Sequence, residues 1–156
     1  MVRVDNQTEI PVRFLIDTTV KKGMRAYAPW KLYRLPESVL LLLRIPYEVL
    51  EGDSLKVGSR ISSIAKAMGF GISSGGCCGC SELQKLLDAA SSQWIRDHMD
   101  DIVEMMQTNA KVKFNRKFPK KMLELAVKSA IVLERRAVRH KNKQLAENRN
   151  FRAKKK

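Results

Sequence analysis

Aromatic residues, histidine and cysteine are all scarce in this 156-residue chain. Aromatic residues make up 6% of it, so a core must be built mainly from aliphatic side chains and Met. The three cysteines all lie between residues 77 and 80. An odd number of cysteines at neighbouring positions excludes the disulfide framework that is typical of small secreted domains.

Long apolar runs and catalytic signatures are also missing. The longest apolar run, residues 39–43, is far shorter than the roughly 20 residues that cross a bilayer, and we expect no membrane contact. The first residues lack the apolar segment of a signal peptide, so we expect synthesis and retention in a cytoplasm. The chain shows no Ser/His/Asp set, phosphate-binding loop or four-ligand metal set. We therefore predict a protein that is not an enzyme and that holds no cofactor.

Basic charge is abundant but unevenly distributed. The formal net charge is +14. Residues 111–156 hold 17 basic and 3 acidic side chains, whereas residues 77–110 hold 2 basic and 6 acidic ones. The acidic middle can neutralise part of the basic end, in the same chain or in a neighbouring copy. The remaining positive charge indicates an anionic partner or a solvated surface.

The pattern of residue types predicts an α+β fold with a change of character near the cysteines. We expect a small β-rich domain with short helices over residues 1–68 and a Gly/Ser/Cys hinge over 69–80. These are followed by a helical domain of about three helices over residues 81–139. A basic C-terminal arm covers residues 140–156. The composition of this arm is typical of a segment without fixed structure in a free monomer.

In the N-terminal half, β-branched and aromatic residues mark the expected strands. These are residues 11–17, 24–28 and 30–35, and residues 54–57 close the sheet. Pro36-Glu37-Ser38 is typical of a helix start, and we expect the apolar residues 39–43 that follow to be buried. Pro46 ends this helix. Ile61, Ile64 and Met68 share a face and predict another short helix.

This half resembles small β-rich domains of tailed-phage virion proteins. The resemblance rests on Val12-Arg13-Phe14-Leu15, on the turn glycine Gly23, and on Leu35-Pro36-Glu37-Ser38-Val39. Ala28-Pro29 departs from it, because such domains more often have Ala-Gly before the second strand.

The Gly/Cys run is similar to an element of other phage proteins. These proteins carry Gly-Cys-Gly-x-Cys before a helix that ends in Leu-Asn or Leu-Asp, and then two further helices. Cys77, Gly79, Cys80 and Leu87-Asp88 match that element, whereas Leu83 stands where a Lys or Arg is usual. Together the two resemblances imply a structural protein of a tailed-phage particle.

The cysteines themselves allow three interpretations. Cys77 and Cys80 have the C-x-x-C spacing of metal ligands, but with Cys78 they make only three thiolates, so a metal needs His98 or a second chain. The same spacing at a helix start lowers a thiol pKa and suits a redox pair. The third interpretation is a tight glycine turn in which small thiols pack beneath the start of a helix.

Helical spacing of apolar residues dominates the C-terminal half. Ser81 is expected to cap a helix that contains Leu83, Leu86 and Leu87. A second helix is predicted over residues 94–106, with His98 in its apolar stripe as a packed residue or, less simply, as a ligand. Residues 109–118 are expected to form a loop before a third helix, which begins at Pro119.

Two charged surfaces are the candidate binding sites. Asp97, Asp101 and Glu104 are predicted to share an acidic helix face, which suits an interface or solvent better than catalysis. The basic surface consists of Arg135, Arg136, Arg139, Lys141, Lys143, Arg149, Phe151, Arg152, Lys154, Lys155 and Lys156. Within it, Phe151 is a natural anchor for a partner pocket.

The phage resemblance and the charged surfaces favour a head–tail connector, also called an adaptor or neck protein, located in the virion and assembled in the host cytoplasm. Its partners would be other copies in a ring, the portal or neighbouring neck and head proteins, and packaged DNA. A capsid decoration protein is the nearest variant. The alternative is a basic nucleic-acid-binding protein, in which the C-terminal arm neutralises phosphates with strong salt dependence.

Overall fold

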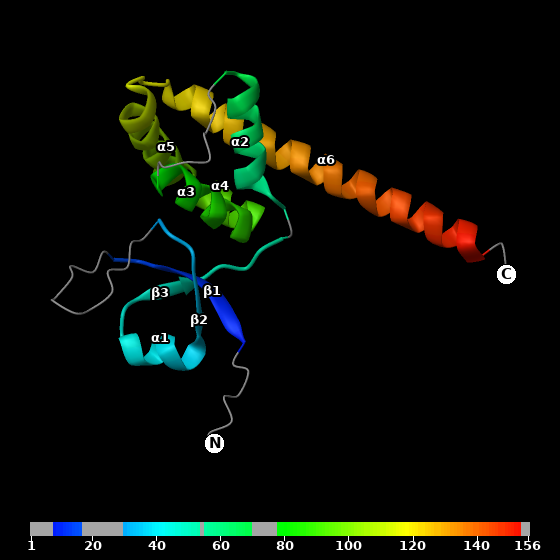
Figure 1. Cartoon of the computed structure of the whole chain (residues 1–156), viewed down its shortest axis with the longest axis horizontal. Helices are drawn as coiled ribbons and strands as arrows, with labels where there is room; N and C mark the ends of the chain where they lie inside the picture. Colours follow the sequence, from blue (N-terminus) through cyan, green and yellow to red (C-terminus); the bar gives the residue numbers. More distant parts are fainter. Residues whose placement is uncertain (1–7, 17–29, 54, 70–77, 154–156) are drawn as a thin grey trace.

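A three-stranded antiparallel sheet and six helices make up the described part of the chain, which confirms the predicted α+β class (Figure 1). The structure, a computed structural model, describes residues 8–16, 30–53, 55–69 and 78–153. The side chains of residues 78, 79, 150, 152 and 153 are outside this description. The predicted strand at residues 24–28 also lies outside the described residues.

The sheet has the strand order β2-β1-β3, with β1 (Glu9–Phe14) in the centre. β2 (Tyr33–Pro36) pairs Tyr33 with Val12, and β3 (Tyr47–Val49) pairs Tyr47 with Phe14. The third strand therefore comes earlier than the predicted 54–57, because Val57 opens a helix instead. β2 likewise begins later than predicted, since Trp30 lies in a turn.

Helix α1 (Glu37–Leu43) begins after Pro36 as predicted, but it buries less than expected. Leu40 packs against Val12 and Phe14 on one face of the sheet. Leu41 and Leu42 are 66% and 81% exposed, so the expectation of a fully buried apolar run is wrong. A seven-residue helix on one side of a sheet presents only one face to it.

The opposite face of the sheet meets the helical body through Arg13. Because side chains alternate along a strand, Arg13 points away from the α1 side. Its guanidinium lies 5.3 Å from the Trp30 ring centre and 5.0 Å from that of Trp94, and its Nε donates to Glu48 at 2.8 Å. Burial by itself would raise the pKa of Glu48, but the hydrogen bond and positive charge of Arg13 hold that pKa below its usual value.

The helical body consists of α2 (Val57–Ala67), α3 (Cys78–Ala89), α4 (Ser92–Asp97), α5 (Met99–Phe114) and the first half of α6 (Lys120–Ala153). Its core is aliphatic, as the composition predicted. The buried residues are Leu50, Leu55, Val57, Leu83, Leu86, Leu87, Ala90, Ile95, Ile102, Val127, Ala130 and Ile131. Helix α2, which the sequence assigned to the N-terminal domain, packs on α3 and α6 and so belongs to this core.

Close packing of α2 on α3 depends on Gly58. A Cβ at this position would lie 2.9 Å from the Gln84 Cα and closer still to its carbonyl oxygen. The N-terminus of α2 is then capped by a side chain of α3, because Asp88 accepts bonds from the Ser59 amide at 2.9 Å and from the Ser59 hydroxyl at 2.5 Å.

Three further expectations for the helical half are corrected. Ser81 lies inside α3 and does not cap it, because the helix already includes Cys78. The predicted 94–106 helix is two helices that separate at His98, whose Nδ1 is 2.9 Å from the Trp94 carbonyl oxygen. The predicted 109–118 loop is shorter, because α5 continues to Phe114 and ends where Asn115 adopts a left-handed conformation.

Candidate nucleic-acid interface: the basic arm

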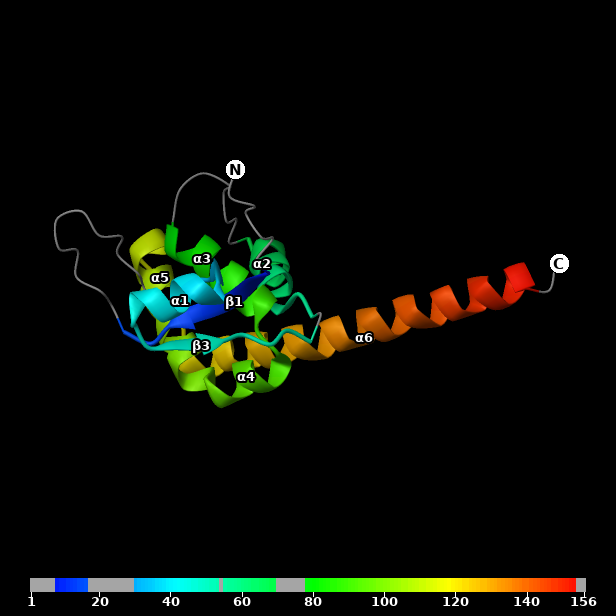
Figure 2. The same ribbon diagram turned by 90° about the horizontal axis from the view of Figure 1, so that it is seen from below.

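Helix α6 holds most of the predicted basic residues and extends far beyond the helical body (Figures 1 and 2). It begins directly after Pro119 and contains neither Pro nor Gly over its 34 residues. Most of its residues are strong helix formers, including Lys, Arg, Leu, Ala, Gln and Glu. We call residues 120–138 the root and residues 139–153 the arm.

The root is fixed by apolar packing. Leu123, Val127, Ala130 and Ile131 are buried on one face at helical spacing, and Val138 packs partly against the same core. Burial of such side chains is worth about 1.5–3 kcal/mol for each fully buried Val, Leu or Ile. The position and direction of the arm are therefore set by the body.

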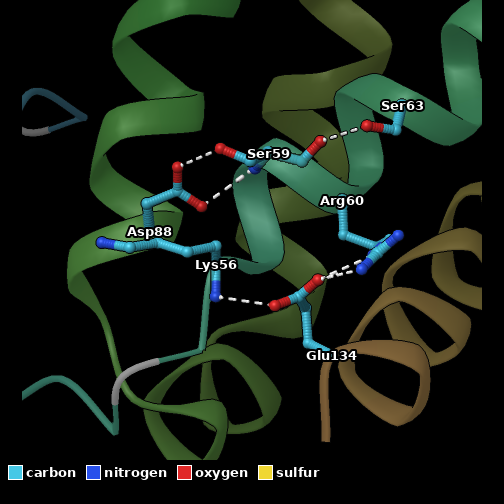
Figure 3. Close-up of polar contacts among 6 residues, drawn as sticks. All are labelled: Lys56, Ser59, Arg60, Ser63, Asp88 and Glu134. Carbon is cyan, nitrogen blue, oxygen red and sulfur yellow. Dashed lines mark hydrogen bonds and ion pairs between the residues drawn. The ribbon is translucent and has the colours of Figure 1, made fainter. Parts of the chain in front are cut away.

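A polar anchor holds the last turns of the root (Figure 3). Glu134 is buried and accepts from the Arg60 guanidinium, with the closest N–O distance at 2.6 Å. Its other carboxylate oxygen is 3.4 Å from the Lys56 backbone nitrogen at the start of α2. Arg60 keeps about a third of its side chain exposed, so the pair is only partly removed from solvent.

Arg135 forms a second anchor to the body. Its guanidinium donates to the Ser92 hydroxyl at 2.8 Å, and the Ser92 amide donates to Asp53 at 2.7 Å. Burial would raise the pKa of Asp53, but the bonds from Ser92 and Leu55 outweigh this effect and hold the pKa of Asp53 below its usual value. The ionised form of Asp53 is thus favoured by the contacts that fix the start of α4.

Among the described side chains from Arg139 to Arg149, no hydrogen bond or ion pair joins the arm to the body. All side chains of the arm that the structure describes are exposed, from Arg139 to Arg149 and again at Phe151. Both views show the arm projecting from the body into open space (Figures 1 and 2). The arm is helical to Ala153, and the expectation that such a segment lacks fixed structure in a free monomer stays a prediction.

Five cations lie on one face of this end of α6, and we call them the basic stripe. At 100° per residue, Arg135, Arg136, Arg139, Lys143 and Arg149 fall within a sector of about 140°. The stripe is about 21 Å long at 1.5 Å per residue. Lys141 lies on the other side of the helix.

The stripe has little neutralising charge within the chain. Lys143 is 4.0 Å from Glu147, and both are well exposed. Among the described residues, no carboxylate lies within ion-pair distance of Arg136, Arg139 or Arg149. Arg135, Arg139 and Lys143 are spaced by four residues, where like charges destabilise a helix by about 0.2–0.5 kcal/mol per pair.

The structure separates the three predicted acidic residues from the arm. Asp97 ends α4 and accepts from Gln93 at 2.9 Å, whereas Asp101 and Glu104 are exposed on α5. The acidic first turn of α5 faces the opposite end of α6, since Asp100 pairs with Lys120 at 2.9 Å and raises the pKa of that lysine. Among the described residues, no ion pair joins these acids to the arm of the same chain.

Of the cysteines, only the side chain of Cys80 is described. Cys80 is half-buried in the first turn of α3, and Cys78 starts the described helix, whereas Cys77 lies outside the described residues. Within the described part, no three His, Cys, Asp or Glu residues are grouped as metal ligands would be. The predicted positions Lys154, Lys155 and Lys156 and the side chain of Arg152 also lie outside the description.

Residues that position the arm were missed from the sequence. The sequence does not reveal the partners of Glu134 and Ser92, because these partners are 74 and 43 residues away in the chain. A usable signal was the position of Glu134 on the apolar face of the root, three residues after Ile131. A carboxylate at such a position needs a buried partner.

Searches against protein-family models, curated proteins and solved structures found no match for this chain. Within the residues that the structure describes, no helix is both long enough and apolar enough to cross a membrane.

Proposed function

We propose that this chain binds nucleic acid through the basic stripe, as a structural protein with a folded body and a projecting helical arm. The observation that carries the proposal is the one-sided row of five exposed cations on the last turns of α6, in which Arg135 also contacts Ser92 of the body. A ligand that neutralises the stripe also removes the repulsion between Arg135, Arg139 and Lys143.

The dimensions of the stripe suit a polyphosphate backbone. Duplex DNA carries about one negative charge per 1.7 Å of its axis, so a stripe of about 21 Å runs past about a dozen phosphates. The guanidinium groups of Arg136, Arg139 and Arg149 each present a planar set of donors to phosphate oxygens. Such contacts carry no sequence information, so we expect binding without base selectivity.

The test is the affinity of the full chain for a labelled 20-base-pair duplex, measured by fluorescence anisotropy at low salt. The stripe variant replaces Arg136, Arg139, Lys143 and Arg149 with Gln, and leaves Arg135 in place because it holds Ser92. The control variant makes the same change at four exposed lysines elsewhere, Lys31, Lys66, Lys85 and Lys111. We expect the stripe variant to lose at least about tenfold in affinity and the control to lose much less. Equal losses would show that the net charge, and not the stripe, binds.

The second candidate function is a ring-forming head–tail connector of a tailed-phage particle, located in the virion. It is favoured by the phage resemblance and by apolar side chains that the sheet unit leaves exposed, Leu41 and Leu42 above all. Copies in a ring would place the arm of one beside Asp101 and Glu104 of the next, and the portal or neighbouring neck and head proteins would contact the ring. A capsid decoration protein would use the same surfaces.

Solution mass distinguishes this candidate from a monomeric nucleic-acid-binding protein. Analytical ultracentrifugation with negative-stain imaging should show closed rings for the wild type. Leu41→Gln with Leu42→Gln should dissociate them, whereas Lys31→Gln, also exposed on the sheet unit, should not. A protein that is monomeric at all concentrations contradicts the connector and leaves the duplex-binding test unaffected.

A further inference from the structure

An apolar groove crosses the helical body at a distance from the basic stripe. It has a volume of about 390 Å³ and lies between α2, α3, α5 and the first turns of α6. Its walls are almost entirely apolar and include Ile61, Met68, Leu83, Met106 and Met122. Volumes of this size are typical of small-molecule sites, and a groove rich in Met adapts to the shape of an aliphatic chain.

Two buried donors without partners lie on one face of α5 beside this groove. The Asn109 side-chain nitrogen, Nδ2, and the Lys113 Nζ are both inaccessible to solvent and make no hydrogen bond. Asn109 lines the groove. Lys113 follows one helical turn later, and its Nζ lies 5.5 Å from the ring centre of Phe114, which also lines the groove.

Such donors indicate the kind of group that completes the site. Buried amide and ammonium groups are nearly always paired, because leaving one unpaired costs about 1–3 kcal/mol and more for a charged group. Residues four apart on a helix have their Cβ atoms about 5–6 Å from each other, so one carboxylate can accept from both. An acceptor that carries negative charge satisfies the ammonium better than a neutral one.

We propose that the groove binds an aliphatic carboxylate of the fatty-acid class. Its chain lies among the apolar side chains of α2, α3 and α6, and its carboxylate accepts from Asn109 and Lys113. A cavity of about 150 Å³ holds one benzene, so on that scale the groove holds on the order of fifteen carbon atoms. A single unbranched chain of this size fits the volume of the groove.

The test is calorimetric titration of the full chain with dodecanoate, below its micelle concentration and at about pH 8, where the carboxylate is ionised. Dodecanol and dodecyltrimethylammonium serve as probes with the same chain and a different head group. We expect binding of dodecanoate, at least tenfold weaker binding of dodecanol, and no detectable binding of the ammonium probe.

Matched variants locate the site. Lys113→Met should weaken dodecanoate binding by about tenfold to a hundredfold, since a hydrogen bond to a charged group is lost. Lys111→Met removes the same charge from an exposed position on the same helix and should leave the affinity unchanged. Ala126→Phe fills the groove and should abolish binding of the chain.

Asn109→Leu keeps the experiment decisive if Ala126→Phe fails to fold. It removes an unpaired buried amide, so the free protein should be at least as stable as the wild type while dodecanoate binds more weakly. The proposal is overturned if dodecanoate does not bind, or if Lys111→Met and Lys113→Met weaken it equally. It is also overturned if neither Asn109→Leu nor a folded Ala126→Phe variant changes the affinity.

Discussion

The root and the arm of α6 are parts of one continuous helix, yet different forces hold them. The root buries four aliphatic side chains in the body and is anchored through Glu134 and Arg135. The described side chains from Arg139 to Arg149 make no hydrogen bond or ion pair with the body, and the arm carries like charges at helical spacing. The root therefore owes its conformation to tertiary packing, whereas the arm depends on local effects, namely intrinsic helix propensity and the i,i+4 pair of Lys143 with Glu147.

This difference explains how one helix can serve two purposes. A packed root fixes the direction in which the stripe points, and an uncovered arm leaves its cations accessible. A helical arm also gathers the cations on one face, so less conformational entropy is lost when an extended polyanion binds than if the arm were fully unfolded.

The root and the arm should differ most in how much stability is lost when an apolar side chain is truncated to Ala. Ile131→Ala, at a side chain that is 1% exposed, should lower the free energy of unfolding by about 2–5 kcal/mol. Leu145→Ala, at a side chain that is 48% exposed in the arm, should change it by less than about 0.5 kcal/mol. Urea denaturation followed by circular dichroism measures both. Equal losses would mean that the arm is packed in solution.

Removing one carboxylate from the root and one from the arm should give a smaller difference in lost stability. Glu134→Ala leaves Arg60 without its partner and should cost about 1–3 kcal/mol, less than a fully buried pair because Arg60 stays partly hydrated. Glu147→Ala in the arm should cost less than about 0.5 kcal/mol. The same denaturation experiment applies. If Glu134→Ala leaves the free energy of unfolding unchanged, the pair of Glu134 with Arg60 does not stabilise the root.

Acid should lower the free energy of unfolding by protonating Asp53, which accepts from the Ser92 amide. Because the pKa of Asp53 is lowered in the folded state, its contribution to stability is present above its unfolded pKa of about 3.9. That contribution is lost as the pH falls through the lower folded value. Asp53→Asn should therefore reduce stability at neutral pH and make the acid decline shallower than in the wild type. Urea midpoints measured at about pH 7 and about pH 3.5 test this, and two parallel pH profiles would contradict it.

The smallest free energies are expected for local opening of the arm. Amides of residues 141–149 should exchange with solvent through openings of about 0–1 kcal/mol, whereas amides of residues 123–134 should need energies close to global unfolding. Hydrogen exchange followed by mass spectrometry resolves the two groups of peptides. Strong protection of the arm amides in the free monomer would show that the arm does not open more easily than the root.

Much of the helical half was predictable because local signals and packing agree there. The apolar spacing of residues 83–90 and 122–137 located α3 and the root. The break at His98 was not predictable, because the apolar stripe from Trp94 to Met106 continues across it. The residue types do not reveal that the His98 ring approaches the Trp94 carbonyl oxygen. They also do not reveal that the helix capped by Ser91 is short and ends before His98.

Composition was a poor guide to local structure in two segments. Charge density in the arm is typical of a segment without fixed structure in a free monomer, whereas the absence of Pro and Gly after Pro119 agrees with the helix that extends to Ala153. Hydrophobicity suggested that residues 39–43 are buried, but a short helix on a small sheet buries Leu40 fully and Leu43 partly and leaves Leu41 and Leu42 exposed.

The groove and its polar end were missed for a related reason. Residues 109–118 were assigned to a loop, so Asn109 and Lys113 were not recognised as neighbours on one helix face. The left-handed Asn115 is the residue that ends α5, and Asn is a common helix terminator.

The most direct test of the proposed function is the salt dependence of duplex binding by the full chain and by the stripe variant. Each phosphate contact contributes a slope of about −0.9 to the logarithm of affinity against the logarithm of salt concentration. Loss of Arg136, Arg139, Lys143 and Arg149 should therefore make the slope shallower by about 3 to 4. An unchanged slope would show that the basic stripe does not contact phosphates and would contradict the proposal.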